Sequence, residues 1–138
     1  MDILEEVRQW LLTFPQWEEG RLLFIDHTDG VPGNAGLFPA GVEELHRTED
    51  VLGNVKLRCR YNFALYRVGV APQLETDARW LMDFTHWVQS QSAAHLAPQL
   101  GEDTRWSAQQ GRLRQVKSPG TGLYAVVLSA DCVRTLEA

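Results

Sequence analysis

The most regular pattern in the chain is an alternation of apolar and polar residues between positions 55 and 65. The apolar positions are Val55, Leu57, Cys59, Tyr61, Phe63 and Leu65, and the positions between them are Lys56, Arg58, Arg60, Asn62 and Ala64. Successive side chains of a strand point to opposite faces, so the pattern predicts a strand with one apolar face and one basic or polar face. Its sheet should be covered on one side only. Because the strand exceeds the usual length of about 5–6 residues, we expect it to extend beyond the domain body as an arm or hairpin.

A first segment with helical spacing precedes Pro15. Asp2 and Glu5 have the spacing of a capping box, with Asp in place of the usual Ser or Thr. Apolar residues then recur every three or four positions and define one face: Ile3, Leu4, Val7, Leu11 and Phe14. Pro15 disfavours helical geometry in the residue before it and should end the helix. We expect Trp10 and Trp17, which flank the apolar face, to pack against a sheet instead of binding a partner.

A second helix is predicted from Thr76 or Asp77, either of which can cap its first turn, to about Ala94. Its apolar stripe consists of Leu81, Phe84 and Val88, with Trp80 and Trp87 on the flank. An amphipathic helix of this kind should cover the apolar face of the sheet.

Four further strands are predicted from apolar runs bounded by turn residues: Leu22–Ile25, about Gly41–Thr48, Leu113–Lys117 and Leu123–Leu128. The first is a continuous apolar run, typical of a strand buried on both faces. Gly53 and Asn54 form the tip of a hairpin before the alternating strand, and residues 118–122 have turn chemistry throughout. The resulting order α-β-β-β-α-β-β predicts an α+β fold with a mainly antiparallel sheet and two helices packed on one face. Residues 1–138 should form a single domain.

Composition narrows the function classes. The formal net charge of −5 argues against sequence-independent binding to nucleic acid, which requires a basic face, and favours solubility. The first ten residues have neither a basic region nor an uninterrupted apolar stretch, so no signal peptide is predicted. No apolar run approaches the roughly 18 residues of a membrane helix. Cys59 and Cys132 lie far apart in the chain and are expected to be reduced and buried.

The sequence offers few candidates for catalytic, cofactor-binding or metal-binding residues. The four histidines form no metal-binding motif, and the glycines of residues 30–36 match no dinucleotide-binding fingerprint. Residues 26–29 (Asp-His-Thr-Asp) are best interpreted as a solvated loop whose carboxylates cap their own backbone. Cys59 falls on the apolar face of its strand, where a thiol is unreactive. We therefore expect no catalytic residue, no cofactor and no metal. The basic row Lys56, Arg58 and Arg60 favours a solvated face or a charged protein contact.

Several local patterns together resemble those of a known family. The segment from Gly53 to Tyr66 is a glycine-led turn followed by a strand that contains the group Phe63-Ala64-Leu65. An aromatic-x-x-Trp-x-x-x-Gln pattern follows over residues 84–91, then Leu-x-Pro-x-Leu over residues 96–100, and Tyr124 lies in a late alternating segment. These features, over residues 3 to 128, resemble small tail-associated proteins of tailed phages and prophages, labelled tail terminator or minor capsid proteins. Residues 26–36 and those after Leu128 match no pattern of the family.

The resemblance implies a virion structural protein without enzymatic activity. A tail terminator forms a ring, typically a hexamer, on the end of the tail tube and joins it to the head–tail connector. The resemblance therefore implies self-association and binding to the tube and connector proteins, with no membrane and no sequence-specific nucleic acid as partner. It also implies a place in the virion tail, and in the bacterial cytoplasm before assembly. Candidate assembly contacts are acids at the hairpin tip and cations on its strand: Glu49, Asp50, Lys56, Arg58 and Arg60. A head-closure or neck protein, and a small-molecule-binding or enzymatic domain using residues 26–36, are the alternatives.

Overall fold

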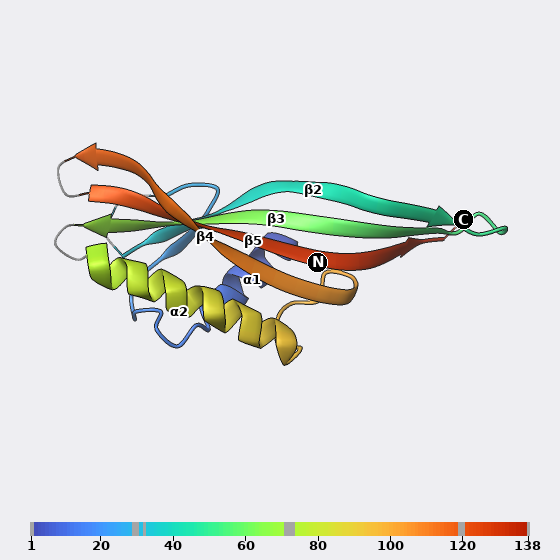
Figure 1. Cartoon of the computed structure of the whole chain (residues 1–138), viewed down its shortest axis with the longest axis horizontal. Coiled ribbons are helices and arrows are strands. Elements are labelled where there is room, and N and C mark those ends of the chain that lie inside the picture. Colours follow the sequence, from blue (N-terminus) through green and yellow to red (C-terminus); the bar gives the residue numbers. More distant parts are fainter. Residues whose placement is uncertain (1, 29–30, 32, 71–73, 119–120, 138) are drawn as a thin grey trace.

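In the part of the chain that the structure describes, two helices and five strands follow one another in the predicted order (Figure 1). The computed structural model describes residues 2–28, 31, 33–70, 74–118 and 121–137, and of residues 69–70, 74–78, 110–118 and 121–124 it describes the backbone only. The elements are α1 (Ile3–Leu11), β1 (Leu23–Ile25), β2 (Ala35–Glu49), β3 (Val55–Val70), α2 (Leu74–Ala93), β4 (Glu102–Ser118) and β5 (Thr121–Leu136).

The five strands form one mixed sheet in the order β1-β2-β3-β5-β4. β1 pairs with β2 in parallel, and every other pair of neighbours is antiparallel. The predicted α+β fold with a mainly antiparallel sheet is therefore confirmed. β3 is the central strand, and its alternation has the predicted meaning: Cys59, Tyr61, Phe63 and Leu65 are buried, while the residues between them are not.

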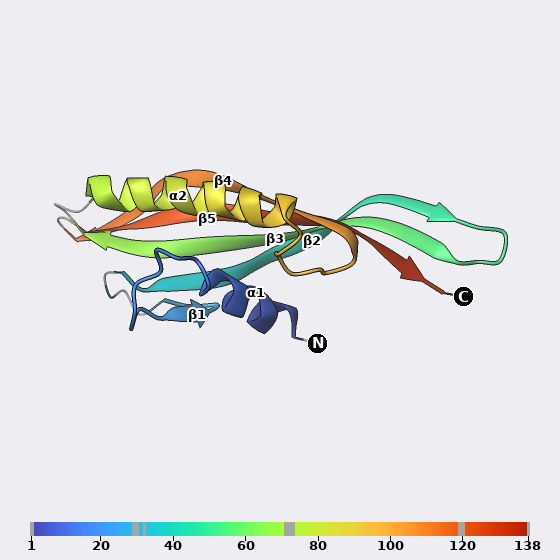
Figure 2. The ribbon, with the colours of Figure 1, turned by 90° about the horizontal axis from the view of Figure 1, so that it is seen from below.

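Both helices cover the apolar face of this sheet. Val7 and Leu11 of α1 and Leu81, Phe84 and Val88 of α2 are fully buried in one core cluster with the apolar residues of β3 and β5. Figure 2 shows α2 lying along β4 and β5, and α1 beside β1 and β2. The opposite face of the sheet is the one that carries the basic and polar residues of β3.

An aromatic cluster lies at the centre of the core. Trp10 stacks on Trp87 with ring centroids 5.3 Å apart and contacts Trp106 at 4.9 Å. Phe14 contacts Trp80, Phe84 and Trp87 at 5.2–5.3 Å. The expectation that Trp10 packs in the core is confirmed. Trp17, which is half-buried, packs against Trp80 and donates its indole N–H to the carbonyl oxygen of Arg21 at 3.1 Å.

The first helix begins as predicted and ends earlier. The Asp2 carboxylate accepts the backbone N–H of Glu5 at 3.2 Å, whereas Glu5 itself forms an ion pair with Arg8 at 2.8 Å. The helix ends at Leu11, well before Pro15. Residues 12–14 form a turn that places Phe14 in the core, so the apolar spacing continues past the end of the helix.

The predicted boundaries of α2 and of four strands were also wrong. α2 begins at Leu74, so Thr76 and Asp77 lie inside the helix and cannot cap it. The run predicted as a strand buried on both faces is an edge strand of residues 23–25 with a neighbour on one side only, and Leu22, which precedes it, is 52% exposed. β2, β4 and β5 are each much longer than predicted. Proline is tolerated in β2 because Pro39 lies beyond the last pair with β1, at a bulge on an unpaired edge.

Candidate functional site

The outstanding feature of the molecule is a sheet segment that projects beyond the helices (Figures 1 and 2). We define this arm as residues 41–60 of the β2–β3 hairpin together with residues 131–136 of β5. β4 begins at Glu102, opposite Val133, so most of the arm lacks β4 as a neighbour. Every residue from 39 to 52 is exposed. The predicted extension of the alternating strand beyond the domain body is thus present.

The tip of the arm is held by one carboxylate. Asp50 accepts the backbone N–H groups of Leu52 at 2.9 Å and Asn54 at 3.0 Å, and the side-chain amide of Asn54 at 3.0 Å. These hydrogen bonds, from Asn54 above all, hold the pKa of Asp50 below its usual value. Gly53 provides the left-handed turn, with a φ of 86°. The tip is therefore fixed, yet it presents two apolar side chains to solvent, Val51 at 102% and Leu52 at 77% exposure.

The face of the arm opposite the helices carries three cations in a row, of which only the innermost is neutralised. Arg60 binds both carboxylate oxygens of Asp131 on β5, at 2.7 and 3.1 Å, which raises its pKa. Lys56 and Arg58 lie farther out and have no carboxylate directly opposite. Their cross-strand neighbours are Thr48 and Thr135 for Lys56, and His46 and Val133 for Arg58.

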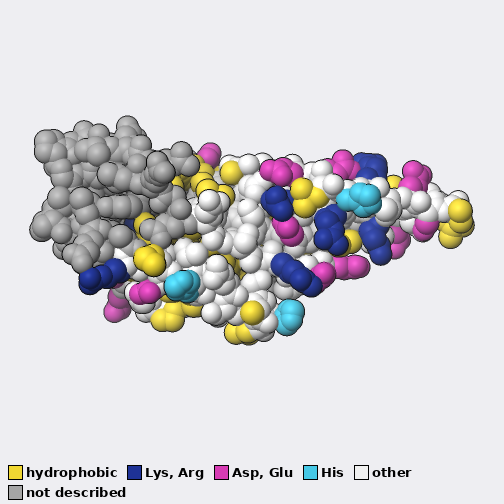
Figure 3. Space-filling view, in the orientation of Figure 1, with side chains coloured by type: hydrophobic (Ala, Val, Ile, Leu, Met, Phe, Trp, Pro, Cys, Tyr) yellow, Lys and Arg dark blue, Asp and Glu magenta, His cyan; other side chains and the backbone are white. Residues whose placement is uncertain are grey.

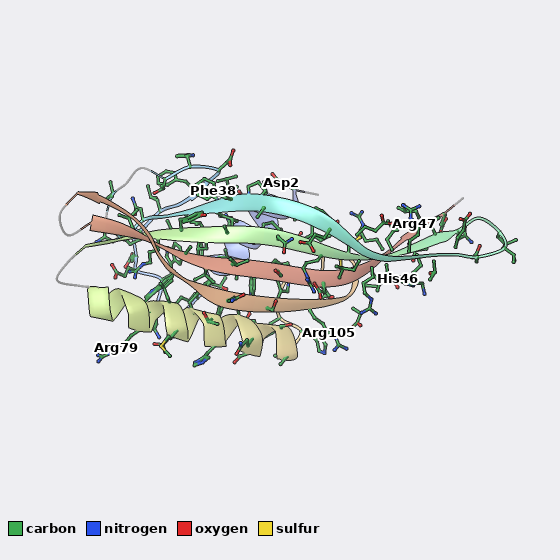
Figure 4. The ribbon with its side chains drawn as sticks, turned by 45° about the horizontal axis from the view of Figure 1, so that its top comes forward. Asp2, Phe38, His46, Arg47, Arg79 and Arg105 are labelled. Carbon is green, nitrogen blue, oxygen red and sulfur yellow. The ribbon has the colours of Figure 1, made fainter. Side chains whose placement is uncertain are left out.

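Lys56 and Arg58 differ from all other described cations. Every other lysine or arginine whose side chain the structure describes has a hydrogen bond, ion pair or ring contact within the chain. Figure 3 shows dark-blue cationic side chains along the arm and hydrophobic ones at its far end, and Figure 4 labels His46 and Arg47 there. The arm thus combines an apolar tip with two cations that no carboxylate in the described part of the chain satisfies.

The free edges of the sheet are protected against strand addition. Beyond Leu37, the outer edge of β2 has no strand beside it in the described part of the chain, and it contains Pro39 and two register shifts, at residues 39–42 and 44–46. Proline, bulges and charged residues are the usual means by which natural sheets prevent edge-to-edge pairing. On the other side, the backbone N–H of Trp106 in β4 is bound by the Ser92 hydroxyl of α2 at 2.9 Å. Contacts with partners should therefore use the faces and tip of the arm more than its edges.

Two open hollows lie on the arm and its base. One, of about 380 Å³, is lined by Thr48, Glu49, Asp50, Asn54, Val55, Lys56 and Thr135. The other, of about 350 Å³, is lined by Arg58, Asp103, Arg105, Asp131, Cys132 and Val133. Neither is the deep apolar pocket that is typical of a small-molecule site.

The predicted contact residues all lie on the arm, in different environments. Glu49, Asp50 and Lys56 surround the first hollow, and Arg58 lines the second. Asp50 and Arg60 are engaged within the chain. Sequence reasoning missed the exposed pair Val51 and Leu52, although two apolar residues inside a predicted turn were a usable signal.

The alternative site, residues 26–36, is described only in part, because residues 29, 30 and 32 lie outside the described residues, and residues 35–36 belong to β2. The buried Asn34 side chain accepts the backbone N–H of Leu22 at 2.9 Å, and its backbone carbonyl accepts that of Val68 at 3.1 Å. Gly36 is required there, because a Cβ would collide with the carbonyl oxygen of His27. The two hollows described above are lined by other residues.

The two cysteines face each other across β3 and β5. Cys59 is the direct partner of Cys132 in the strand register, and both are free and buried. Burial raises the pKa of Cys132 above its ordinary value, and the neighbouring Cys59 adds to this effect. A buried thiol of this kind is a poor nucleophile.

Among the described residues, no three His, Cys, Asp or Glu side chains lie close enough together to hold a metal ion. Within the same residues, neither helix has the length and apolar character needed to cross a bilayer. No protein-family model matches the chain, and no curated protein matches it as a relative. The family resemblance of the motifs stays a prediction.

Proposed function

We propose that this protein is a non-catalytic structural component of a phage or prophage tail, a tail terminator that caps the tail tube and joins it to the head connector. The motif resemblance supports the tail setting, and the arm supports the assembly role. The single observation that carries the proposal is the projecting arm, whose residues 39–52 are all exposed.

The arm has features of a surface that becomes buried in an assembly. Burying an apolar side chain of this size contributes roughly 1.5–3 kcal/mol, and in the free chain Val51 and Leu52 contribute none of it. Asp50 and Gly53 nevertheless fix the tip, which lowers the entropy that a partner would have to remove on binding. A heterologous contact of one arm with the next subunit generates a ring when the rotation closes.

The test is self-association of the purified chain. Light scattering coupled to size exclusion, over a wide range of concentration, should show a concentration-dependent oligomer, and negative-stain electron microscopy should show rings. The double variant Val51→Ser/Leu52→Ser should remain folded and lose the oligomer. Met82→Ser, at a similarly apolar position on α2 that is 53% exposed, is the matched control and should assemble normally. A chain that stays monomeric throughout and forms no rings with purified tail tubes would overturn the proposal.

A further inference from the structure

We infer that the two free cations of the arm, Lys56 and Arg58, dock on the acidic N-terminal segment of a second copy of this chain. The inference rests on the proposed self-assembly and names the surface that each subunit would offer its neighbour. It is carried by two cations of the arm, Lys56 and Arg58, and two carboxylates of the N-terminal segment, Glu19 and Asp26, that have no partner within the part of the chain that the structure describes.

The cationic half of the contact follows from the strand register. Arg60 has Asp131 and Glu43 directly opposite on the neighbouring strands, whereas the residues directly opposite Lys56 and Arg58 are threonine, histidine and valine. The chain therefore neutralises the cation nearest the body and leaves the two outer ones available. Both project from the same face, because they are two residues apart in a strand.

The acidic half lies in the body. Residues 2–28 contain six carboxylates and two arginines, while the hairpin residues 41–60 contain four carboxylates and four Lys or Arg. Both arginines of the N-terminal segment are already paired, Arg8 with Glu5 and Arg21 with Glu18. Glu19 and Asp26 are exposed, and their carboxylates have no partner among the residues that the structure describes.

An apolar match accompanies the charges. Leu22 lies in sequence between Glu19 and Asp26 and is 52% exposed, and the arm tip presents Val51 and Leu52 beside its own cations. Both regions thus have exposed apolar residues. The charges that would pair across the contact are cationic at Lys56 and Arg58 and acidic at Glu19 and Asp26, and the arm tip also carries the exposed carboxylate of Glu49. An apolar contact excludes water from its surroundings, and the lower dielectric there strengthens ion pairs at the edge of the contact.

The geometry allows contact between copies. In Figure 2 the arm projects to the right, while β1 lies at the opposite side of the body beneath β2. Donor and acceptor surfaces are different patches, so the contact is heterologous and propagates from one subunit to the next. Nucleic acid is the competing occupant of the arm. Nucleic acid is disfavoured by the net charge of −5. In addition, the two free cations of the arm could neutralise only two phosphates.

The experiment measures self-association of the full chain by sedimentation equilibrium as a function of salt. Lys56→Glu/Arg58→Glu and, separately, Glu19→Lys/Asp26→Lys should each weaken association by about tenfold or more, because two ion pairs are replaced by like-charge contacts. Mixing the two variants should restore association, since each supplies the sign that the other lost. Wild-type association should weaken with added salt, which screens exposed charges.

Two controls separate the possible failures. Arg47→Glu also reverses a cation of the arm, but Arg47 is already paired with Glu44 at 2.7 Å, so association should change little. If the wild type assembles and Lys56→Glu/Arg58→Glu assembles equally well, the inference is wrong and the assembly role stands. The inference is also wrong if that variant loses only its binding to a short DNA duplex. If the wild type never associates, the proposed function fails with it.

Discussion

Phe84 is the largest fully buried side chain among the described residues, so its truncation should be strongly destabilising. Its side chain is 0% exposed, and its ring lies 5.3 Å from Phe14, 5.4 Å from Trp80 and 5.9 Å from Trp87. Truncation of a buried Phe to Ala costs about 3–5 kcal/mol in total, and the three aromatic contacts of Phe84, worth about 0.5–1.5 kcal/mol each, place it in the upper part of that range. We expect Phe84→Ala to lose about 4–5 kcal/mol, against a total of about 5–15 kcal/mol for an ordinary domain.

Urea denaturation followed by tryptophan fluorescence measures this loss. With an m-value of about 2 kcal/mol per molar urea, the midpoint should fall by about 2 M. Met82→Ala, two residues away on the same helix and 53% exposed, should cost less than about 1 kcal/mol. If Phe84→Ala does not fold, Phe84→Leu should show a smaller loss of the same kind. A loss below about 1.5 kcal/mol for Phe84→Ala at unchanged m would refute the packing of α2 on Phe14.

Three further predictions concern the arm. Hydrogen bonds lower the pKa of Asp50, so the stabilisation that its carboxylate gives the tip is fully present above its ordinary pKa of about 4. That stabilisation is lost as the pH falls through the lower pKa of the folded state. An NMR titration of the Leu52 amide with a midpoint at or above about 4 would contradict this prediction. Cys59 and Cys132 should resist iodoacetamide in the native protein and react in denaturant, and rapid native labelling would show that the arm base is open. Asp131→Asn removes the partner of the innermost arginine and adds a third free cation, so self-association should become tighter and steeper in its salt dependence; an unchanged salt slope in sedimentation would argue against the cationic face.

The fold was predictable where the signal is local. The alternation from Val55 to Leu65 depends only on which side chains face the helices, so period two identified the central strand and its covered face. Residues 102–109 of β4 gave no such signal. This strand is at the sheet edge and its outward positions are polar, so only Thr104 and Trp106 among these eight residues are buried.

The sequence predicted where the candidate site lies, but not which of its cations are neutralised by a carboxylate. The sequence placed Lys56, Arg58 and Arg60 on one face, because that follows from spacing alone. It did not distinguish them, because the partner of Arg60 is Asp131, which is 71 residues away in the chain and depends on the pairing of β3 with β5. Likewise, the Asp50 clamp becomes visible only when the hairpin turn is closed.

The strand order also has a consequence for how the chain is made. β5 is the last strand in sequence, yet it lies between β3 and β4, and its pairs with β3 run from Val70–Thr121 to Val55–Leu136. During synthesis the inner edge of β3 therefore stays without its neighbour until β5 emerges from the ribosome. Pairing over such sequence separations is slow, with folding times of about milliseconds to seconds. A nascent chain with an unpaired central strand is prone to aggregation, so the arm can be completed only after the translation of β5.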